Sequence, residues 1–474
     1  MSAPRSPRWS ARARAAAALA TTALVVLAAA CGPPAGVKRA QSLLDRGDFR
    51  GAATAADEEL GKTPGDGQLV RIRIRAALGL GDARDAVARY RAWREARGGQ
   101  DDLAALRTMA MTTLWQGLTS PSAQVQVQAI RAIERLEIEA FARDVGERMG
   151  DDDDVVAAAA AVAVLRAFPQ APDVATEMLA SPDPAARAIA VEGIGRKVGK
   201  HAAEDLRLAA VDRDPRVRAA AIAALAGLAD PADTGRLTEA ASDASAEVRA
   251  AALRGLARGK RGDLGAVAEA ALADPTLGVR LAAVELLVAS RGKDAARPLL
   301  VHADAMVAAY AARALRDGAA GAAAIDRALA DDDWTVRAGA INLAEVALGK
   351  DAARVRAERA AADPVVGVRV AAARLLAYLG DRPRAIALYA AALAAEAPTD
   401  RVGAAAELAA LGDPRGPTAL AELAATDDPG VRRHVITAHR AARVITPGLW
   451  SALADDDAGN RIDAAAALYE LGAR

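Results

Sequence analysis

The stretch Asp214-Pro215-Arg216-Val217-Arg218-Ala219-Ala220 holds the pattern that decides the fold. Asp suits the N-cap of a helix, because its carboxylate accepts hydrogen bonds from free backbone amides. Pro suits the first helical position, where no N–H donor is needed. After them, Val217, Ala220 and Ala224 fall on one face at the helical period. The stretch therefore predicts the beginning of a helix that packs through small side chains.

The Val-Arg pair of this stretch recurs along the chain, at first with a constant spacing. It stands at Val217-Arg218, Val248-Arg249 and Val279-Arg280, and further copies follow at Val336-Arg337, Val368-Arg369 and Val431-Arg432. Such a period is typical of solenoids, because each helix pair buries its apolar face against its neighbours. We expect residues 120–474 to form an all-α fold, an α-solenoid of about a dozen stacked antiparallel helix pairs.

The composition agrees with helices and excludes other classes. Hydrophobic residues are 53% of the chain and aromatic residues only 3%, which disfavours a β-sandwich or barrel. Basic and acidic residues number 61 each, and four of the arginines lie close to the N-terminus, at Arg5, Arg8, Arg12 and Arg14. The rest of the chain is therefore slightly acidic, without the basic excess of a nucleic-acid-binding protein. We expect no nucleic-acid partner.

The repeat resembles the HEAT repeat family, particularly its short bacterial HEAT-like form. The resemblance implies that an Asp before each Val-Arg pair and the Arg of the pair form a ladder along the turns between helices. It places this ladder at Asp212, Asp243, Asp274, Asp331, Asp363, Arg218, Arg249, Arg280, Arg337 and Arg369. In residues 150–167 and 399–411 the pair is missing or reordered, so the ladder is expected to be interrupted there.

Two Gly-Asp turns occur near the N-terminus, at Gly47-Asp48 and Gly81-Asp82. The small residues Ala52 and Ala86 come after them, which lets two helices lie close together. This pattern and its spacing are similar to the tetratricopeptide repeat. The resemblance implies two such repeats in residues 38–99, joined by a connecting helix in residues 100–119 to the solenoid. Because at least three repeats are needed for a stable stack, we expect these two repeats to pack against the solenoid.

Residues 1–30 are typical of an export signal, with a basic start and an uncharged apolar stretch that ends in small residues. Leu27-Ala28-Ala29-Ala30-Cys31 then resembles the lipobox of bacterial lipoproteins, and Cys31 is the only cysteine of the chain. The resemblance implies lipid on Cys31, and residues 31–37 are expected to be a tether. Gly32 stands where an Asp would signal retention in the inner membrane, which favours the outer membrane, facing the periplasm. Ala28-Ala29-Ala30 also fits ordinary signal cleavage, which would give a soluble periplasmic or secreted protein.

The sequence contains no pattern of catalytic or ligand-binding residues. Of the four histidines only His434 and His439 are close in sequence, and their spacing puts them on different sides of a helix. Acidic runs such as residues 151–154 precede helices, where carboxylates act as caps, and they lack the spacing of a calcium loop. Nucleophile and phosphate-loop motifs are missing too. We expect no metal, no cofactor and no enzymatic activity.

These observations predict an envelope scaffold that binds a protein partner along the concave face of the solenoid. In this hypothesis the solenoid projects from the membrane as an arm, and Trp334 is the candidate partner-binding residue. Two alternatives stay open: a chaperone-like holdase for envelope clients, and an enzyme related to the HEAT-like lyases.

Overall fold

The computed structural model describes residues 34–168, 170–259 and 262–472. The predicted signal segment and Cys31 lie outside these residues. The described residues form helices and connecting turns without a strand. In these ranges no helix combines the length and the apolar character that crossing a membrane requires. The chain divides into two compact units, with the boundary between Thr112 and Thr113.

The first unit is a series of helices joined by short turns: α2 (Ala35–Asp45), α3 (Phe49–Leu60), α4 (Gly67–Gly79), α5 (Ala83–Ala96) and the first part of α6 (Leu103–Leu118). Gly47 and Gly81 end α2 and α4 with φ of 77° and 78°, a conformation that favours glycine. The next residues, Asp48 and Asp82, cap α3 and α5. The Gly-Asp turns therefore reverse the chain between antiparallel helices.

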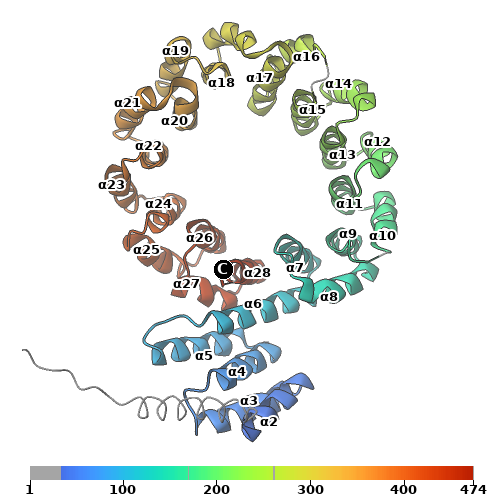
Figure 1. Ribbon diagram of the computed structural model, residues 1–474, viewed down its shortest axis with the longest axis vertical. Helices are drawn as coiled ribbons and strands as arrows, with labels where there is room; N and C mark the ends of the chain where they lie inside the picture. The colour runs from blue at the N-terminus through green and yellow to red at the C-terminus, as the bar shows by residue number, and fades with distance from the viewer. Residues whose placement is uncertain (1–33, 169, 260–261, 473–474) are drawn as a thin grey trace, which may run out of the picture. The chain divides into compact units, whose positions relative to one another are not determined.

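The second unit, residues 113–474, has an inner and an outer layer of helices (Figure 1). The inner helices are α7 (Ala123–Arg135), α9 (Asp154–Ala163), α11 (Pro184–Lys197), α13 (Pro215–Leu228), α15 (Ala246–Arg258), α17 (Leu277–Arg291), α18 (Ala305–Leu315), α20 (Trp334–Leu348), α22 (Val366–Tyr378), α24 (Pro398–Ala410), α26 (Pro429–Ala442) and α28 (Ala458–Gly472). The outer helices are α8 (Ala142–Glu147), α10 (Ala171–Glu177), α12 (Ala203–Ala209), α14 (Thr234–Ala240), α16 (Gly265–Ala271), η6 (Lys293–Val301), α19 (Gly318–Leu329), α21 (Lys350–Ala360), α23 (Arg382–Ala392), α25 (Arg415–Leu423) and α27 (Pro447–Ser451).

Aspartates cap many of the inner helices, as the Asp-Pro motif predicts. Asp214, for example, caps α13 by accepting from the backbone N–H of Arg216 at 2.9 Å. Asp153 and Asp333, from two of the acidic runs, cap α9 and α20 in the same way. The core between the layers is built from fully buried alanine, leucine, valine and isoleucine. The described part of this unit is therefore an α-solenoid.

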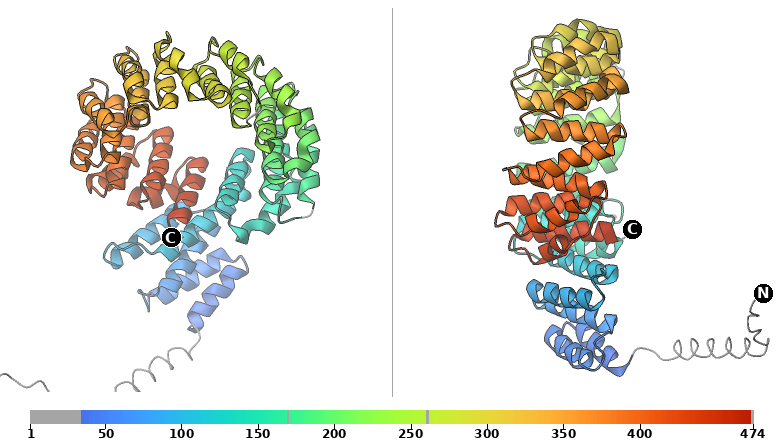
Figure 2. Two further views of the ribbon diagram at one scale, coloured as in Figure 1. Left: turned by 45° about the horizontal axis from the view of Figure 1, so that its top comes forward. Right: turned by 90° about the vertical axis from the view of Figure 1, so that its left-hand side faces the viewer.

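Small residues let neighbouring inner helices approach closely. A Cβ on Gly193 of α11 would lie 2.2 Å from a methyl group of Val162 in α9, and one on Gly195 would lie 2.5 Å from Ala224 of α13. Gly255 of α15 has the same relation to Ala226 of α13. Close packing in the inner layer bends the stack consistently toward that layer, as the left-hand view in Figure 2 shows.

The second unit closes on itself, which the expectation of a projecting arm did not include. The last inner helix, α28, packs against the first, α7. Gln128 of α7 donates from Nε2 to the carbonyl oxygen of Gly459 at 3.0 Å. Ile462 of α28 is 2% exposed, and its Cδ1 lies 2.5 Å from where a Cβ on Gly117 would be. We call this unit the closed solenoid, and we call the contact of α28 with α7 and with Gly117 at the end of α6 its seam.

Candidate functional site

The predicted ladder consists of arginines that join consecutive repeats. Arg218 of α13 donates from Nε and Nη2 to the two carboxylate oxygens of Asp243, at 2.9 and 2.8 Å. Its Nη1 donates to the carbonyl oxygens of Asp212 and Arg213 in its own turn, at 2.9 and 3.2 Å. Each such arginine thus fixes its own turn and binds the carboxylate of the next repeat. We call one of these units a rung.

The same rung occurs at Arg187–Asp212, Arg249–Asp274, Arg337–Asp363 and Arg432–Asp455. Sequence reasoning assigned ladder roles to neither Arg187 nor the Arg432–Asp455 pair. The signal was present, because both arginines belong to copies of the repeat motif and each precedes an aspartate by 23 to 25 residues.

Two predicted ladder residues, Asp331 and Arg369, do not form an arginine–aspartate pair between repeats in the described structure. Asp331 accepts from the backbone N–H of Asp333 at 2.9 Å, and among the described residues no arginine pairs with its carboxylate. The reason is that Ala308 occupies the arginine position of the preceding inner helix. Arg369 donates only to the carbonyl oxygens of Asp363 and Pro364, because the next repeat has Ala395 where the aspartate would stand.

Arg280 forms a rung with a partner that the sequence did not indicate. His302 occupies the usual aspartate position, and its Nδ1 accepts from the backbone N–H of Asp304 at 3.0 Å. Arg280 therefore binds the carboxylate of Asp304, which also caps α18. The ladder tolerates the substitution because the N-cap carboxylate lies only two residues further along.

The rungs change the acidity of their carboxyl groups. Hydrogen bonds from Arg218 lower the pKa of Asp243 below its ordinary value of 3.8, while partial burial opposes them. The pKa of Asp274 is lowered in the same way by Arg249. Because the folded-state pKa is depressed, a rung contributes its stability above about pH 4 and loses it as the pH falls through the folded-state pKa.

Replacing Arg218 by Met should lower the stability of the closed solenoid by about 2 kcal/mol at neutral pH, because Asp243 loses two charge-assisted hydrogen bonds in a site where both side chains are under 20% exposed. Urea unfolding followed by circular dichroism measures the change. The control is Arg216→Met, since Arg216 is 58% exposed and pairs only within its own turn. The difference between Arg218→Met and wild type should shrink in acid below the ordinary carboxyl pKa; an undiminished difference would contradict the rung as its cause.

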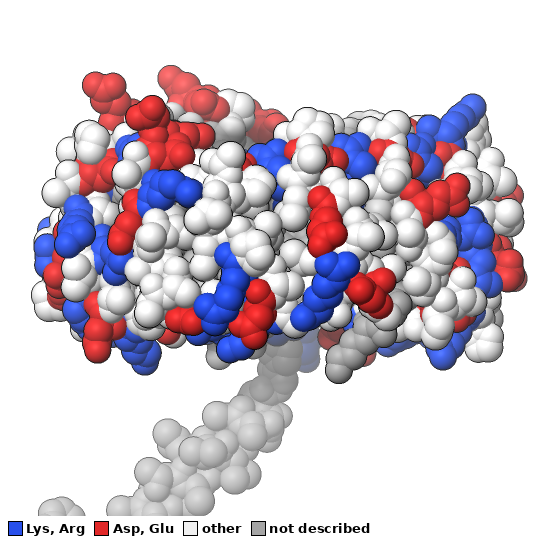
Figure 3. Space-filling view, turned by 90° about the horizontal axis from the view of Figure 1, so that it is seen from above, with Lys and Arg blue, Asp and Glu red and all other residues white. Residues whose placement is uncertain are grey.

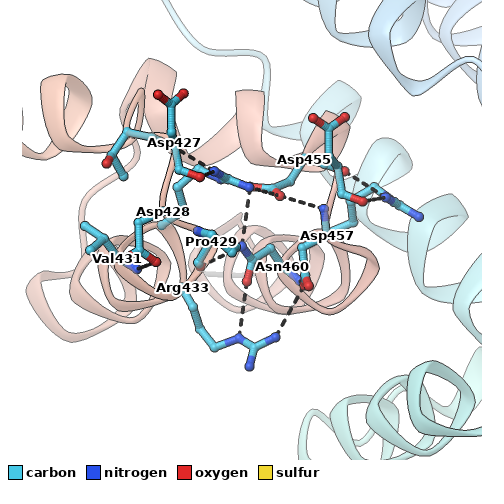
Figure 4. A network of polar contacts seen from close by, with 12 residues as sticks. Asp427, Asp428, Pro429, Val431, Arg433, Asp455, Asp457 and Asn460 are labelled. Carbon is cyan, nitrogen blue, oxygen red and sulfur yellow. Dashed lines mark hydrogen bonds and ion pairs between the residues drawn. The ribbon is translucent and has the colours of Figure 1, made fainter.

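The last repeat is held by a polar network around the buried Asn460 (Figure 4). Its Nδ2 donates to the carbonyl oxygen of Pro429 at 3.0 Å, and its Oδ1 accepts from Nε of Arg433 at 3.2 Å. Asp457 accepts from the backbone N–H of Asn460 at 2.8 Å. Asn460 thus ties the beginning of α28 to the beginning of α26. Its single amide side chain carries no motif that sequence reasoning could have recognised.

At the seam the rung is replaced by neutral groups. Ser120 and Gln126 occupy the positions of Asp212 and Arg218 in the α7 repeat. Gln126 donates from Nε2 to the carbonyl oxygen of Ser120 at 2.7 Å, as the arginines do in their own turns. Arg461 of α28 donates to the carbonyl oxygens of Asp455 and Asp456. In place of a rung, the seam has apolar packing and the Gln128–Gly459 hydrogen bond.

The inner surface near the seam is hollowed, with a volume of about 1110 Å³. Alanines form most of its floor: Ala188, Ala219, Ala220, Ala223 and Ala251. Charged side chains of both signs stand around it: Arg131, Arg135, Asp153, Glu192, Arg216, Glu247, Arg254, Arg440 and Asp463. A lining of small residues and of charges of both signs forms a surface that suits a polypeptide partner, which offers apolar and charged groups together.

Trp334 lies at the first position of α20 and is 46% exposed. Its indole packs on the next inner helix, where a Cβ on Gly367 would lie 2.4 Å from the ring. The glycine therefore makes room for the indole. Trp334 combines packing between repeats with an exposed edge, and it does not line the hollow near the seam.

The two neighbouring histidines have structural hydrogen bonds. His439 is fully buried, and burial lowers its pKa, so the imidazole is neutral. Its ring nitrogens lie 2.8 Å from the carbonyl oxygen of Val435 and 2.7 Å from the hydroxyl of Thr446. His434 bonds the carbonyl oxygen of Gly430. Within the described ranges no three His, Cys, Asp or Glu side chains are grouped as a metal site would require.

The outer surface mixes charges of both signs. In Figure 3, basic and acidic side chains are interspersed with uncharged ones over most of the face drawn, acidic side chains gather at its upper left edge, and basic ones form no continuous expanse. Many charges of the closed solenoid are in ion pairs, such as Arg291 with Asp263 and Glu269, and Arg297 with Asp317. Such a surface provides no stripe for a polyanion.

The described fold is thus an α-solenoid with a hollowed inner surface, and comparisons agree with this class. Residues 171–257 match the family model for HEAT repeats. This part of the chain, from α10 to α15, therefore contains HEAT repeats. A search of curated proteins finds no match.

Solved structures similar to this chain include an engineered protein, with 19% identity over 73% of this chain and 100% of that one, at a TM-score of 0.25. Kap121p is 11% identical over 85% of this chain and 57% of its own, at a TM-score of 0.33. The complex of CpcE and CpcF of phycocyanin lyase from Nostoc sp. PCC7120 is 20% identical over 61% of this chain and 91% of that one, at a TM-score of 0.22. At these identities each is a likeness of fold.

Proposed function

We propose that this protein is a non-catalytic scaffold of the bacterial cell envelope, which binds a protein partner on the inner surface of its HEAT-repeat solenoid. The observation that carries the proposal is the hollow inner surface near the seam, with its floor of alanines and its edges of both charges. Solenoids leave such a surface free because their core is buried between repeats. On the outer layer, by contrast, charges pair with one another at Arg297–Asp317 and Arg356–Asp326.

In this proposal the chain is exported and then anchored through lipid on Cys31. The support is the apolar stretch that precedes the only cysteine, and the small residues at its end. The predicted tether is residues 31–37, and its last three residues already belong to α2, which begins at Ala35. Two tetratricopeptide-like repeats in residues 38–99 come after it. The Gly-Asp turns at Gly47 and Gly81 support those repeats. The protein faces the periplasm from the outer membrane.

The proposal is tested by affinity capture of the C-terminally tagged full chain from gently solubilised native envelopes. The matched control is Cys31→Ser, which removes the acceptor of the lipid and leaves the solenoid unchanged. We expect one or two partners in near-equal amounts with wild type and a reduced yield with the control. Metabolic labelling with a fatty acid should mark wild type and spare Cys31→Ser.

Other outcomes separate the alternatives. Many clients in small amounts would favour the holdase, which binds promiscuously through apolar surface. If Cys31→Ser does not change the yield of captured partner, and wild type is not labelled by the fatty acid, the lipid anchor is contradicted and the protein is a soluble scaffold. Recovery of no partner by either form would refute the scaffold.

A further inference from the structure

A second hollow, of about 540 Å³, lies between the C-terminal halves of the inner helices α15, α17 and α18. Its floor is apolar, with Val284 and Val288 of α17 flanked by alanines. Three arginines stand around the floor: Arg254 and Arg258 from α15, and Arg313 from α18. This is a small apolar surface surrounded by positive charge.

The positive charge is not neutralised within the site. Among the residues that the structure describes, no carboxylate lies within 4.0 Å of the guanidinium nitrogens of these three arginines. Glu285 is the one carboxylate that lines the hollow, and it accepts a hydrogen bond from the hydroxyl of Tyr310. In the ladder, by contrast, arginines such as Arg218 have an aspartate partner. Three cations therefore face one anion in this hollow.

Tyr310 distinguishes this place from the neighbouring repeats. Counted from the N-cap, the equivalent positions of α13, α15 and α17 are Ala220, Ala251 and Ala282. The phenol ring bounds the hollow on the α18 side, and Arg313 stacks over it at 5.1 Å from its centre. Stacking and the hydroxyl bond to Glu285 hold this wall in place, so the basic groups are positioned before a ligand arrives.

We propose that this hollow binds an acidic segment of the protein partner, in which a Glu or Asp carboxylate lies between Arg254 and Arg313 and an adjacent apolar side chain covers the partly exposed Val288. The inference rests on the proposed scaffold function and names the chemistry of its partner. Arginine forks favour carboxylates, and the apolar floor favours a polypeptide, which carries apolar side chains beside its charges. Arg254 also lines the hollow near the seam, where Glu192 and Glu247 disfavour a long polyanion.

The test uses the full chain and a fluorescein-labelled peptide of alternating Glu and Leu, with the matching Gln and Leu peptide as a control. Fluorescence anisotropy at low salt should show binding of the Glu peptide and little binding of the Gln peptide. In the triple variant R254Q/R258Q/R313Q the affinity should fall about tenfold or more, and added salt should weaken the wild-type complex. Arg374→Gln, an inner-helix arginine that lines neither hollow and pairs with Glu407, should leave the affinity unchanged. Circular dichroism verifies that both variants are folded.

Each contrary result overturns the inference. If the Glu peptide binds the triple variant as tightly as wild type, its binding site lies outside this hollow. If the Glu peptide does not bind wild type, the hollow does not recognise acidic segments. If inorganic phosphate or phosphatidylglycerol vesicles displace the peptide at a lower concentration of negative charge than the peptide itself provides, the hollow binds phosphate groups in preference to carboxylates. The scaffold itself is tested separately. If the triple variant captures the same envelope partner as wild type, the scaffold stands and this inference fails.

Discussion

Replacing Ile462 with Asp should open the closed solenoid at its seam while the helices remain folded. Ile462 is 2% exposed and packs over Gly117 of α6, which Ala129 of α7 also approaches, so the substitution loses apolar burial and places a charge in an apolar contact. Together these effects cost several kcal/mol, about 3 or more. The seam has no charged rung to compensate, because Ser120 and Gln126 take the ladder positions there.

Small-angle scattering and analytical gel filtration measure the opening. The maximum dimension and the hydrodynamic radius should both increase, and the far-ultraviolet circular dichroism should change little. Val301→Asp is the matched control, because Val301 is 80% exposed on the outer layer. An unchanged radius for a folded Ile462→Asp variant would contradict the seam as the point of closure.

The second large effect is expected at Gly416, where α25 crosses α24. A Cβ there would lie 2.2 Å from the backbone nitrogen of Ala409 and 2.7 Å from the carbonyl oxygen of Ala405. Backbone atoms cannot rotate away as side chains do, so Gly416→Ala must force the two helices apart. We expect a loss of about 3 kcal/mol or more, visible as a lower urea midpoint.

Gly403 provides the control on the neighbouring helix. It lies inside α24, and nothing stands within 4 Å of where its Cβ would be. Gly403→Ala should therefore stabilise the protein by about 0.5 to 1 kcal/mol through better helix propensity. Equal effects of the two substitutions would mean that helix propensity, and not the close crossing, governs the result.

The repeat could be predicted from the sequence because its signals are local. Asp and Pro at the helix beginnings, and small residues at the helical period, lie within a few positions of one another in each copy. The ladder could also be predicted, since Asp212 and Arg218 recur with the repeat. The Arg280–Asp304 rung could not, because His302 replaced the expected aspartate and the partner moved to a cap.

The closure of the solenoid and the two hollows could not be predicted from the sequence, for a different reason. Whether a stack closes depends on the angle between successive repeats, which is summed over all of them, so a small difference at each step decides between an open arm and a closed solenoid. That angle arises from contacts such as that between Gly195 and Ala224. The spacing of the repeat in the sequence does not predict the geometry of such contacts. The hollow at Tyr310 likewise needs three helices in place before its arginines are seen to share one surface.

Closure also has a consequence for how the protein folds. In an open solenoid the contacts are local, and folding starts anywhere and spreads from repeat to repeat. Here Gln128 and Gly459 must meet across 331 residues of sequence. Bringing such distant segments together carries an entropic cost that is met before the contact forms, so this step should be slow. Of the described helices, α28 is synthesised last and closes the solenoid, and until it arrives α7 exposes an unsatisfied apolar face.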